Sequence, residues 1–161
     1  MTLVLIGLPG AGKTTVGKAA AEALQVPFFD CDDAVVQDAG MEIPAIFARE
    51  GENGFRRRET RCLTRLLERE NCVIAAGGGA VLSAENRRAL QRARVAFLDR
   101  PVDDIMLTFE AEGRPMMTGH TLQQLADERR SLYLESADIV VSENGIDQEI
   151  QVLLRYWRDA D

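Results

Sequence analysis

Residues 7–14, GLPGAGKT, constrain the fold of this chain more than any other stretch. They match the GxxxxGK[ST] pattern in full, they follow a short apolar run at residues 3–6, and they precede a helical pattern that extends from Val16 to Leu24. Glycines let such a turn curl so that successive N–H groups point at phosphate oxygens, and the following helix adds its positive end. The alternative is an ordinary glycine-rich turn between a strand and a helix. We interpret the stretch as a phosphate-binding loop, or P-loop.

Short, continuous apolar runs recur along the chain, as expected of strands buried on both faces of a parallel sheet. After residues 3–6 they occupy 26–29, 72–76, 95–98 and 139–141. Helical patterns lie between them, over about 53–69, 121–134 and 146–157, and the second of these helices begins at a TLQQ capping box. This alternation predicts an α/β fold with a five-stranded parallel sheet flanked by helices, which binds ligands beyond the carboxyl ends of its strands.

Length and charge limit what else the chain can be. Its 161 residues suit a single domain over 1–161, and the net charge of −7 argues against nucleic acid, whose binders present a positive surface. We expect small-molecule partners and, because no long apolar stripe interrupts an acidic surface, a monomer.

The cysteines and the N-terminal residues indicate in which cellular compartment the protein is expected. The three cysteines form no CxxC pair, which favours the reduced thiols of a cytoplasmic protein over disulfides or a zinc site. The apolar run near the N-terminus is too short for a signal peptide or a membrane span. We therefore expect a cytoplasmic protein with no membrane partner.

Charged side chains gather around the predicted phosphate site. In a P-loop, Lys13 would bridge the outer phosphates and the Thr14 hydroxyl would ligate Mg²⁺. Asp30, Asp32 and Asp33 follow the second strand, so their carboxylates emerge at the same edge of the sheet. One of them could hold hydrated Mg²⁺ and one could bind an acceptor hydroxyl and take its proton. Helix capping is the competing interpretation, above all for Asp33.

Two further stretches suggest an acceptor site. Gly77, Gly78 and Gly79 follow the third strand, and three successive glycines indicate either close backbone approach to a ligand or a tight turn. Upstream, FRRRETR lies on the helical pattern of residues 53–69, where most of its arginines form a solvated face partly paired with Glu59 and Glu68. Arg56 differs from the other arginines, because its apolar neighbour Phe55 can hold it beside the core. Its side chain would then point into the ligand cleft expected at the carboxyl ends of the strands.

The combined motifs resemble the shikimate kinase family over essentially the whole chain. The matching segments are GLPGAGKTTVG (7–17), FFDCDD (28–33), GMEIPAIFAREGENGFRRRE (40–59), VIAAGGGAV (73–81), RPMM (114–117) and ERRSLYLESAD (128–138). The resemblance implies a P-loop kinase fold like that of nucleoside monophosphate kinases, with a substrate-binding helical region near 31–60 and a lid near 110–121. It also implies an enzyme, an alcohol-group phosphotransferase that moves the γ-phosphoryl group of MgATP to the 3-hydroxyl of shikimate, on the route to chorismate and the aromatic amino acids.

The same resemblance implies roles for individual residues. Arg56 and Arg129 would hold the shikimate carboxylate, with Arg129 preferred to Arg130 because it lies four residues before Tyr133. Gly78 would add a backbone contact, Asp32 would bind the hydroxyls and act as base, and Asp30 would lie near Mg²⁺ with Thr14. The lid arginine, Arg114, would reach the transferring phosphate and, like Lys13 and Asp32, serve catalysis. Contacts to the nucleotide would come from Gly10, Ala11, Gly12, Lys13, Thr14, Thr15 and Arg114. Leu107, Thr108 and Phe109 stand where many relatives place an arginine against adenine.

Other functions stay open at this point. A related kinase of gluconate or of a nucleotide would share the P-loop, and a non-catalytic paralogue could bind nucleotide for regulation. Retention of Lys13, Thr14, Asp30, Asp32 and Arg114 favours catalysis. A GTPase is disfavoured because the chain has no NKxD motif, and the length is too short for a large motor.

Overall fold

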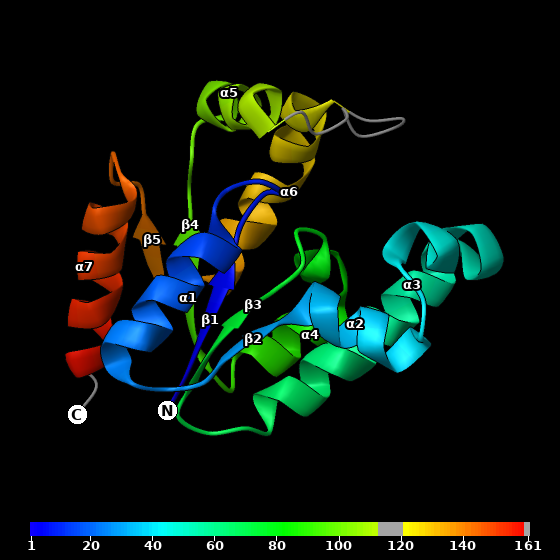
Figure 1. Cartoon of the computed structure of the whole chain (residues 1–161), viewed down its shortest axis with the longest axis horizontal. Coiled ribbons are helices and arrows are strands. Elements are labelled where there is room, and N and C mark those ends of the chain that lie inside the picture. Colours follow the sequence, from blue (N-terminus) through cyan, green and yellow to red (C-terminus); the bar gives the residue numbers. More distant parts are fainter. Residues whose placement is uncertain (113–120, 160–161) are drawn as a thin grey trace.

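A five-stranded, fully parallel sheet forms the centre of the molecule (Figure 1). This computed structural model describes residues 1–112 and 121–159. Strand order is β2-β3-β1-β4-β5, with bounds of Thr2–Ile6 for β1, Phe28–Asp30 for β2, Cys72–Ala75 for β3, Arg94–Leu98 for β4 and Ile139–Val141 for β5. The predicted sheet is confirmed. Strand β2 begins two residues later than predicted, because Pro27 has no N–H to donate to a ladder.

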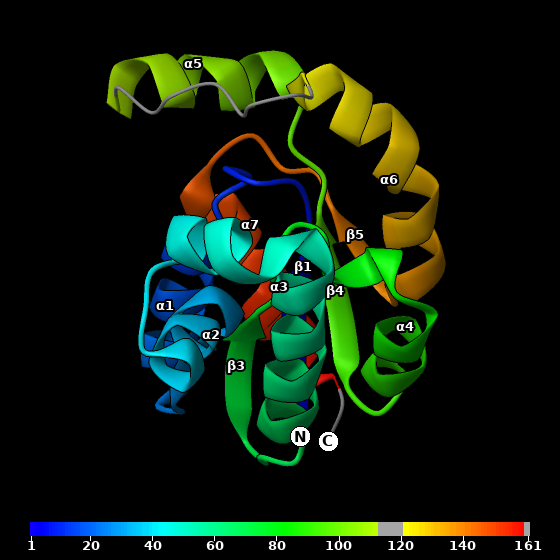
Figure 2. The same cartoon turned by 90° about the vertical axis from the view of Figure 1, so that its right-hand side faces the viewer.

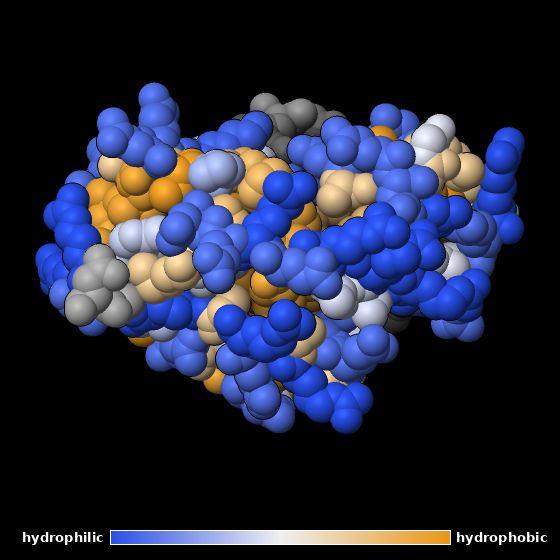
Figure 3. Space-filling model, turned by 90° about the horizontal axis from the view of Figure 1, so that it is seen from below, coloured by the Kyte–Doolittle hydropathy of each residue, from blue (hydrophilic) through white to orange (hydrophobic). Residues whose placement is uncertain are grey.

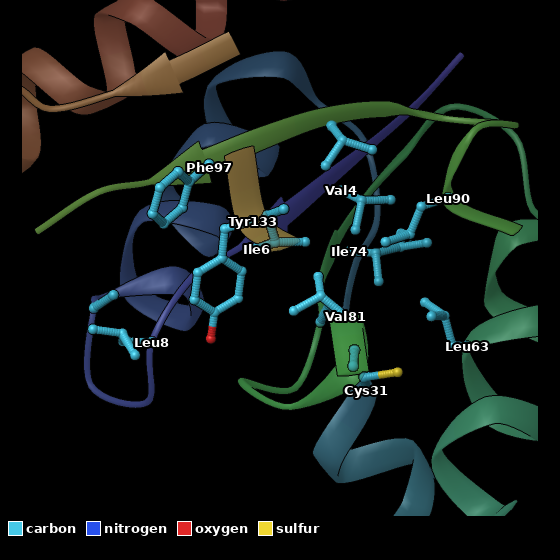
Figure 4. Packing of buried hydrophobic residues seen from close by; sticks show 14 of the residues in the cluster. Val4, Ile6, Leu8, Cys31, Leu63, Ile74, Val81, Leu90, Phe97 and Tyr133 are labelled. Atoms are coloured by element: carbon cyan, nitrogen blue, oxygen red, sulfur yellow. The ribbon is translucent and has the colours of Figure 1, made fainter. Parts of the chain in front are cut away.

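Helices cover both faces of the sheet. Their bounds are Lys13–Leu24 for α1, Cys31–Ala39 for α2, Ile43–Leu67 for α3, Ala84–Leu90 for α4, Val102–Glu112 for α5, Leu122–Ser136 for α6 and Ile146–Arg158 for α7, and a 3₁₀ turn, η1, spans Ala80–Leu82. Alternate side chains of β1 point to opposite faces, so Leu3 and Leu5 pack with α1 and α7, while Val4 and Ile6 pack with α3 and α6. Figure 4 shows the second of these clusters.

Helix α3 is two helical arms joined at a kink. Gly51 has φ 69° and ψ −177°, outside the helical region, and a left-handed φ of this kind favours glycine. The arm after the kink is the helix predicted over 53–69, whereas the arm before it was not predicted. Together with α2 it extends away from the sheet (Figure 1).

Helix α6 begins as predicted at a capping box. Thr121 accepts from the N–H of Gln124 at 3.1 Å, and the Gln124 side chain accepts from the N–H of Thr121 at 2.8 Å. In Figure 2, α5 and the start of α6 lie beyond the carboxyl ends of the strands, and the rest of α6 runs down beside β4. The predicted lid near 110–121 falls largely outside the described residues.

Polar side chains dominate the surface at the opposite edge. Seen from the side at which β1 begins (Figure 3), hydrophilic residues surround smaller groups of apolar ones. None of the helices that the structure describes combines the length and the apolar character needed to cross a membrane.

Candidate active site

Four loops meet at the carboxyl edge of the sheet and enclose a cavity of about 600 Å³. They are the P-loop after β1, the acidic residues after β2, the glycines after β3 and the segment after β4. This placement follows from the parallel order of the strands, which brings all their carboxyl ends to one edge.

Within the P-loop, Gly7, Gly10 and Gly12 all have positive φ values, and the last two lie near the left-handed helical region. Gly10 has φ 79° and Gly12 has φ 94°, and Gly12 is the N-cap of α1. A Cβ atom at Gly10 would also collide with the ring of Phe109, so α5 packs directly on this turn. The loop therefore needs glycine for two reasons: its backbone conformation favours glycine, and at Gly10 a side chain would clash with Phe109.

Most residues predicted to bind nucleotide line the cavity. Gly10, Gly12, Lys13, Thr14 and Thr15 do so, whereas Ala11 is buried beneath the loop and its N–H donates to the Leu8 carbonyl at 3.1 Å. The Lys13 ammonium donates to the carbonyls of Gly7 and Leu8 at 2.8 and 2.9 Å. Burial lowers the pKa of Lys13 to about 8, against the opposing charges of Asp32 and Asp30. Since a phosphate would favour the charged ammonium, this lysine suits an anionic ligand.

Asp30 joins β2 to the P-loop. One of its carboxylate oxygens accepts from the Thr14 hydroxyl at 2.6 Å, and the other accepts from the N–H of Asp32 at 2.9 Å and of Asp33 at 3.4 Å. Asp30 is thus the N-cap of α2, the role that the sequence suggested above all for Asp33. The cap fixes the carboxylate beside Thr14.

The Thr14–Asp30 pair fits a magnesium ion. Both side chains offer oxygen, the ligand that Mg²⁺ prefers, and Mg²⁺ is usually held by one or two protein groups plus phosphates and water. The described part of the chain contains no group of three or more His, Cys, Asp or Glu side chains that could hold a metal ion.

Asp32 is the second carboxylate of the cavity. Burial, and after it the neighbouring charges of Asp30 and Glu59, raise its pKa to about 6, while Lys13 opposes them. A carboxylate with this pKa is ionised at neutral pH, yet it binds a proton more readily than an exposed aspartate. Asp32 can therefore accept a proton from a ligand hydroxyl.

Two arginines on different helices lie close to residues of this cavity: Arg56 lies against Gly79, next to the cavity residue Gly78, and Arg129 is near enough to Lys13 to lower the pKa of that lysine. Arg56 lies on α3 and Arg129 on α6, and the Nε atom of each is buried without a hydrogen-bond partner in the described structure. Arg129 is only 8% exposed, whereas Arg130 pairs with Asp99 at 2.5 Å. Buried donors normally have partners, so these two Nε atoms suit an anionic ligand.

Glu59 was recognised from the sequence only as one possible partner of a surface cluster. It is 1% exposed and accepts from Arg56 at 2.9 Å, which fixes the arginine next to the glycine turn. A Cβ atom at Gly79 would collide with the Arg56 guanidinium, and one at Gly77 would approach the Glu59 carboxylate too closely. The glycines are therefore needed for close packing with these side chains. The i,i+3 spacing of Arg56 and Glu59 is the sequence signal for the pair.

The other arginines of α3 form the surface face that the sequence predicted. Arg58, Arg61 and Arg65 all donate to Asp38 of α2, at 2.9, 2.6 and 3.3 Å, and Arg58 also pairs with Glu50. Their main partner is thus Asp38 rather than Glu68, and they hold α2 against α3.

Arg100 is a cavity residue that sequence reasoning missed. It follows β4, lines the cavity with Gly12 and Thr108, and one of its guanidinium nitrogens lies 3.8 Å from the position of a Cβ atom at Gly12. Its place directly after a buried strand was the available signal. Arg114, predicted for the lid, lies outside the described residues.

A phosphate-binding loop that opens on a cavity with acidic side chains, with two arginines close by, defines together with this sheet a P-loop kinase. Comparison with known proteins gives the particular family. The sequence model of the family described as shikimate kinase matches residues 9–156. Shikimate kinases of Burkholderia thailandensis and Symbiobacterium thermophilum are 42% and 44% identical to this chain over 147 residues, which are 88% and 86% of it and 80% and 84% of the relatives. The chain belongs to the shikimate kinase family.

Solved structures agree. A shikimate kinase from Acinetobacter baumannii, determined in complex with shikimate, superposes with a TM-score of 0.89 at 37% identity and covers 98% of this chain and 93% of its own. A shikimate kinase from Aquifex aeolicus gives 0.83 at 32% identity, with 99% and 98% covered. A sugar kinase from Janibacter, at 16% identity and a TM-score of 0.62, shares the fold alone.

Proposed function

We propose that this chain transfers the γ-phosphoryl group of ATP to the 3-hydroxyl of shikimate. Family membership supports the reaction, and one observation supports the acceptor: two arginine Nε donors, from α3 and α6, are buried without hydrogen-bond partners in the described structure, and the Arg56 guanidinium lies against the glycine turn that borders the P-loop cavity. A carboxylate accepts paired hydrogen bonds from guanidinium, whose planar geometry lysine cannot reproduce. Shikimate carries such a carboxylate on a hydroxylated ring, so one small molecule supplies both the anion and the acceptor hydroxyl.

Binding would orient the acceptor between two sets of residues. Arg56 and Arg129 hold the carboxylate, with Gly78 contributing backbone contact, and Asp32 accepts a hydrogen bond from the hydroxyl that reacts. Positioning of this kind is the main contribution of proteins to phosphoryl transfer, which needs little covalent assistance. The distance from the arginines to Asp32 then selects which hydroxyl meets the phosphate.

In the transfer step, the acceptor oxygen forms a bond to the γ-phosphorus while the bond from that phosphorus to the β–γ bridging oxygen breaks. ADP leaves with the electron pair of the broken bond, and the hydroxyl proton passes to the Asp32 carboxylate. Lys13 offsets the negative charge on the outer phosphates. Its protonated form is required for this, and its pKa of about 8 keeps it largely protonated at neutral pH.

Thr14 and Asp30 would hold Mg²⁺, which when bound neutralises charge on the nucleotide phosphates. Backbone N–H groups of Gly10, Gly12 and Thr15 would contact the same phosphates, and Arg100 would add a positive charge beside Gly12. Arg114 of the lid would reach the transferring phosphate. Location in the cytoplasm and a monomeric state remain predictions.

Release of ADP from MgATP tests the proposal, with shikimate, gluconate and nucleoside monophosphates offered in parallel. We expect stimulation by shikimate alone. Stimulation by gluconate or a nucleotide would give the chain a different acceptor, and no stimulation by any acceptor would favour a regulatory nucleotide-binding protein.

A further inference from the structure

Tyr133 is a buried side chain with its polar end at the active site. It lies on α6, is 1% exposed, and its ring stacks on Phe97 of β4 with 5.0 Å between centroids. Figure 4 shows the ring within the apolar cluster and the hydroxyl pointing away from Phe97. The ring therefore belongs to the core, whereas the hydroxyl reaches beyond it.

The hydroxyl of Tyr133 fixes the glycine turn after β3. It donates to the carbonyl of Gly78 at 2.5 Å, a contact between residues 55 positions apart. The Gly78 carbonyl and the Gly79 N–H belong to one planar peptide unit, so a bond to the carbonyl sets the direction of both. A Cβ atom at Gly79 would meet the Arg56 guanidinium, which places this same peptide unit against an arginine of the acceptor site.

Arg129 lies one helical turn before Tyr133 on the same face of α6. Burial raises the pKa of Tyr133 to about 12, although the charges of Arg129 and Arg56 lower it. The hydroxyl consequently stays protonated at neutral pH and remains a donor to Gly78. Both arginines of the acceptor site lie close to this one hydroxyl.

We infer that Tyr133 is a positioning residue for the acceptor: its hydroxyl locks the Gly78 turn to α6, so that the turn, Arg56 and Arg129 keep one relative arrangement. The inference rests on the proposed function, since the acceptor is the shikimate proposed there. Packing alone does not need the hydroxyl, because a phenylalanine ring would fill the same space against Phe97. Removal of the hydroxyl therefore separates positioning from packing.

Tyr133→Phe tests the inference, with Tyr156→Phe as the matched control. Tyr156 is the other tyrosine of the chain, on α7, where its ring lies 3.8 Å from the Arg94 guanidinium. We expect Tyr133→Phe to raise KM for shikimate about tenfold and to leave kcat and KM for ATP within about twofold, the loss being that of one buried hydrogen bond. The control should change none of these constants. Amide resonances of Gly78 and Gly79 should shift in Tyr133→Phe without ligand.

Several outcomes would overturn the inference. They are an unchanged KM for shikimate, equal rises in both KM values with a lower Tm, or an unfolded variant, because the last two would make the hydroxyl a stabilising group only. A wrong proposed function would give a different result from a wrong inference about Tyr133, because the unmodified protein would then show no shikimate-dependent release of ADP.

Discussion

Replacement of Asp32 by asparagine should make the protein more stable and inactive. Asparagine has nearly the same shape but no charge, so the substitution removes the cost of keeping a carboxylate ionised in the cavity. Loss of the proton acceptor should lower kcat by at least about 100-fold. A variant that is more stable but inactive would show that the charge of Asp32 destabilises the fold and is kept because the reaction needs it.

The size of the stability gain follows from the pKa of Asp32. Burial is the largest cause of its rise from 3.8 to about 6, and one pKa unit corresponds to about 1.4 kcal/mol. Near pH 7 the native state therefore loses about 2 to 3 kcal/mol by ionising Asp32, a figure that already includes the attraction of Lys13. For a chain of this length the variant should melt about 5 to 10 °C higher.

The dependence on pH provides the sharper test. Because the pKa is raised on folding, the penalty is absent below the unfolded value of 3.8, grows up to about 6, and is complete above that. Urea unfolding followed by circular dichroism should thus show the full gain at pH 7.5 and almost none near pH 4. Asp33→Asn is the control, since that exposed neighbour should change stability by less than about 1 kcal/mol. Equal stability of Asp32→Asn and the parent at pH 7.5, or a gain that persists at pH 4, would refute the reasoning.

Three further predictions concern kinetics. Arg56→Lys should raise KM for shikimate at least tenfold and leave KM for ATP unchanged. The control, Arg57→Lys at an exposed position, should alter neither constant. Equal initial-rate constants for Arg56→Lys and the parent would contradict the carboxylate assignment. The pH profile of kcat/KM for shikimate should rise through about 6, as Asp32 ionises, and fall through about 8, as Lys13 loses its proton, so a flat profile from pH 5 to 9 would disagree. Arg100→Met should raise KM for ATP several-fold without affecting shikimate, and an unchanged KM for ATP would remove Arg100 from the nucleotide site.

Local patterns predicted most of the fold, because its determinants lie close together in the sequence. Apolar runs located every strand of the sheet, and the P-loop motif located the start of α1. The position of Pro27 could have corrected the start of β2. The first arm of α3 escaped detection, since a left-handed glycine at Gly51 interrupts the helical periodicity on which the prediction depended.

Side-chain roles were predictable only where a motif carries them. Sequence position favoured Arg56 because of the apolar neighbour Phe55, but it could not show that Glu59 is buried against it. The pairing of three arginines with Asp38 depends on how α2 packs against α3, and the bond from Tyr133 to Gly78 depends on α6 lying beside the turn after β3. Such non-local contacts leave no trace in local spacing.

The charged groups of the proposed site share one physical property. The protein alone stabilises each of them less than a bound ligand would. The pKa of Lys13 is lowered and that of Asp32 is raised, mainly by burial, and the Nε atoms of Arg56 and Arg129 lack partners in the described structure. Phosphate would favour charged Lys13, a hydroxyl would donate to Asp32, and a carboxylate would pair with the arginines. The three missing interactions differ in chemistry. Together they select ligands that contain a phosphate, a hydroxyl and a carboxylate, and MgATP with a hydroxylated carboxylic acid supplies all three. Binding of these ligands then provides the stabilisation that the charged groups lack in the protein alone.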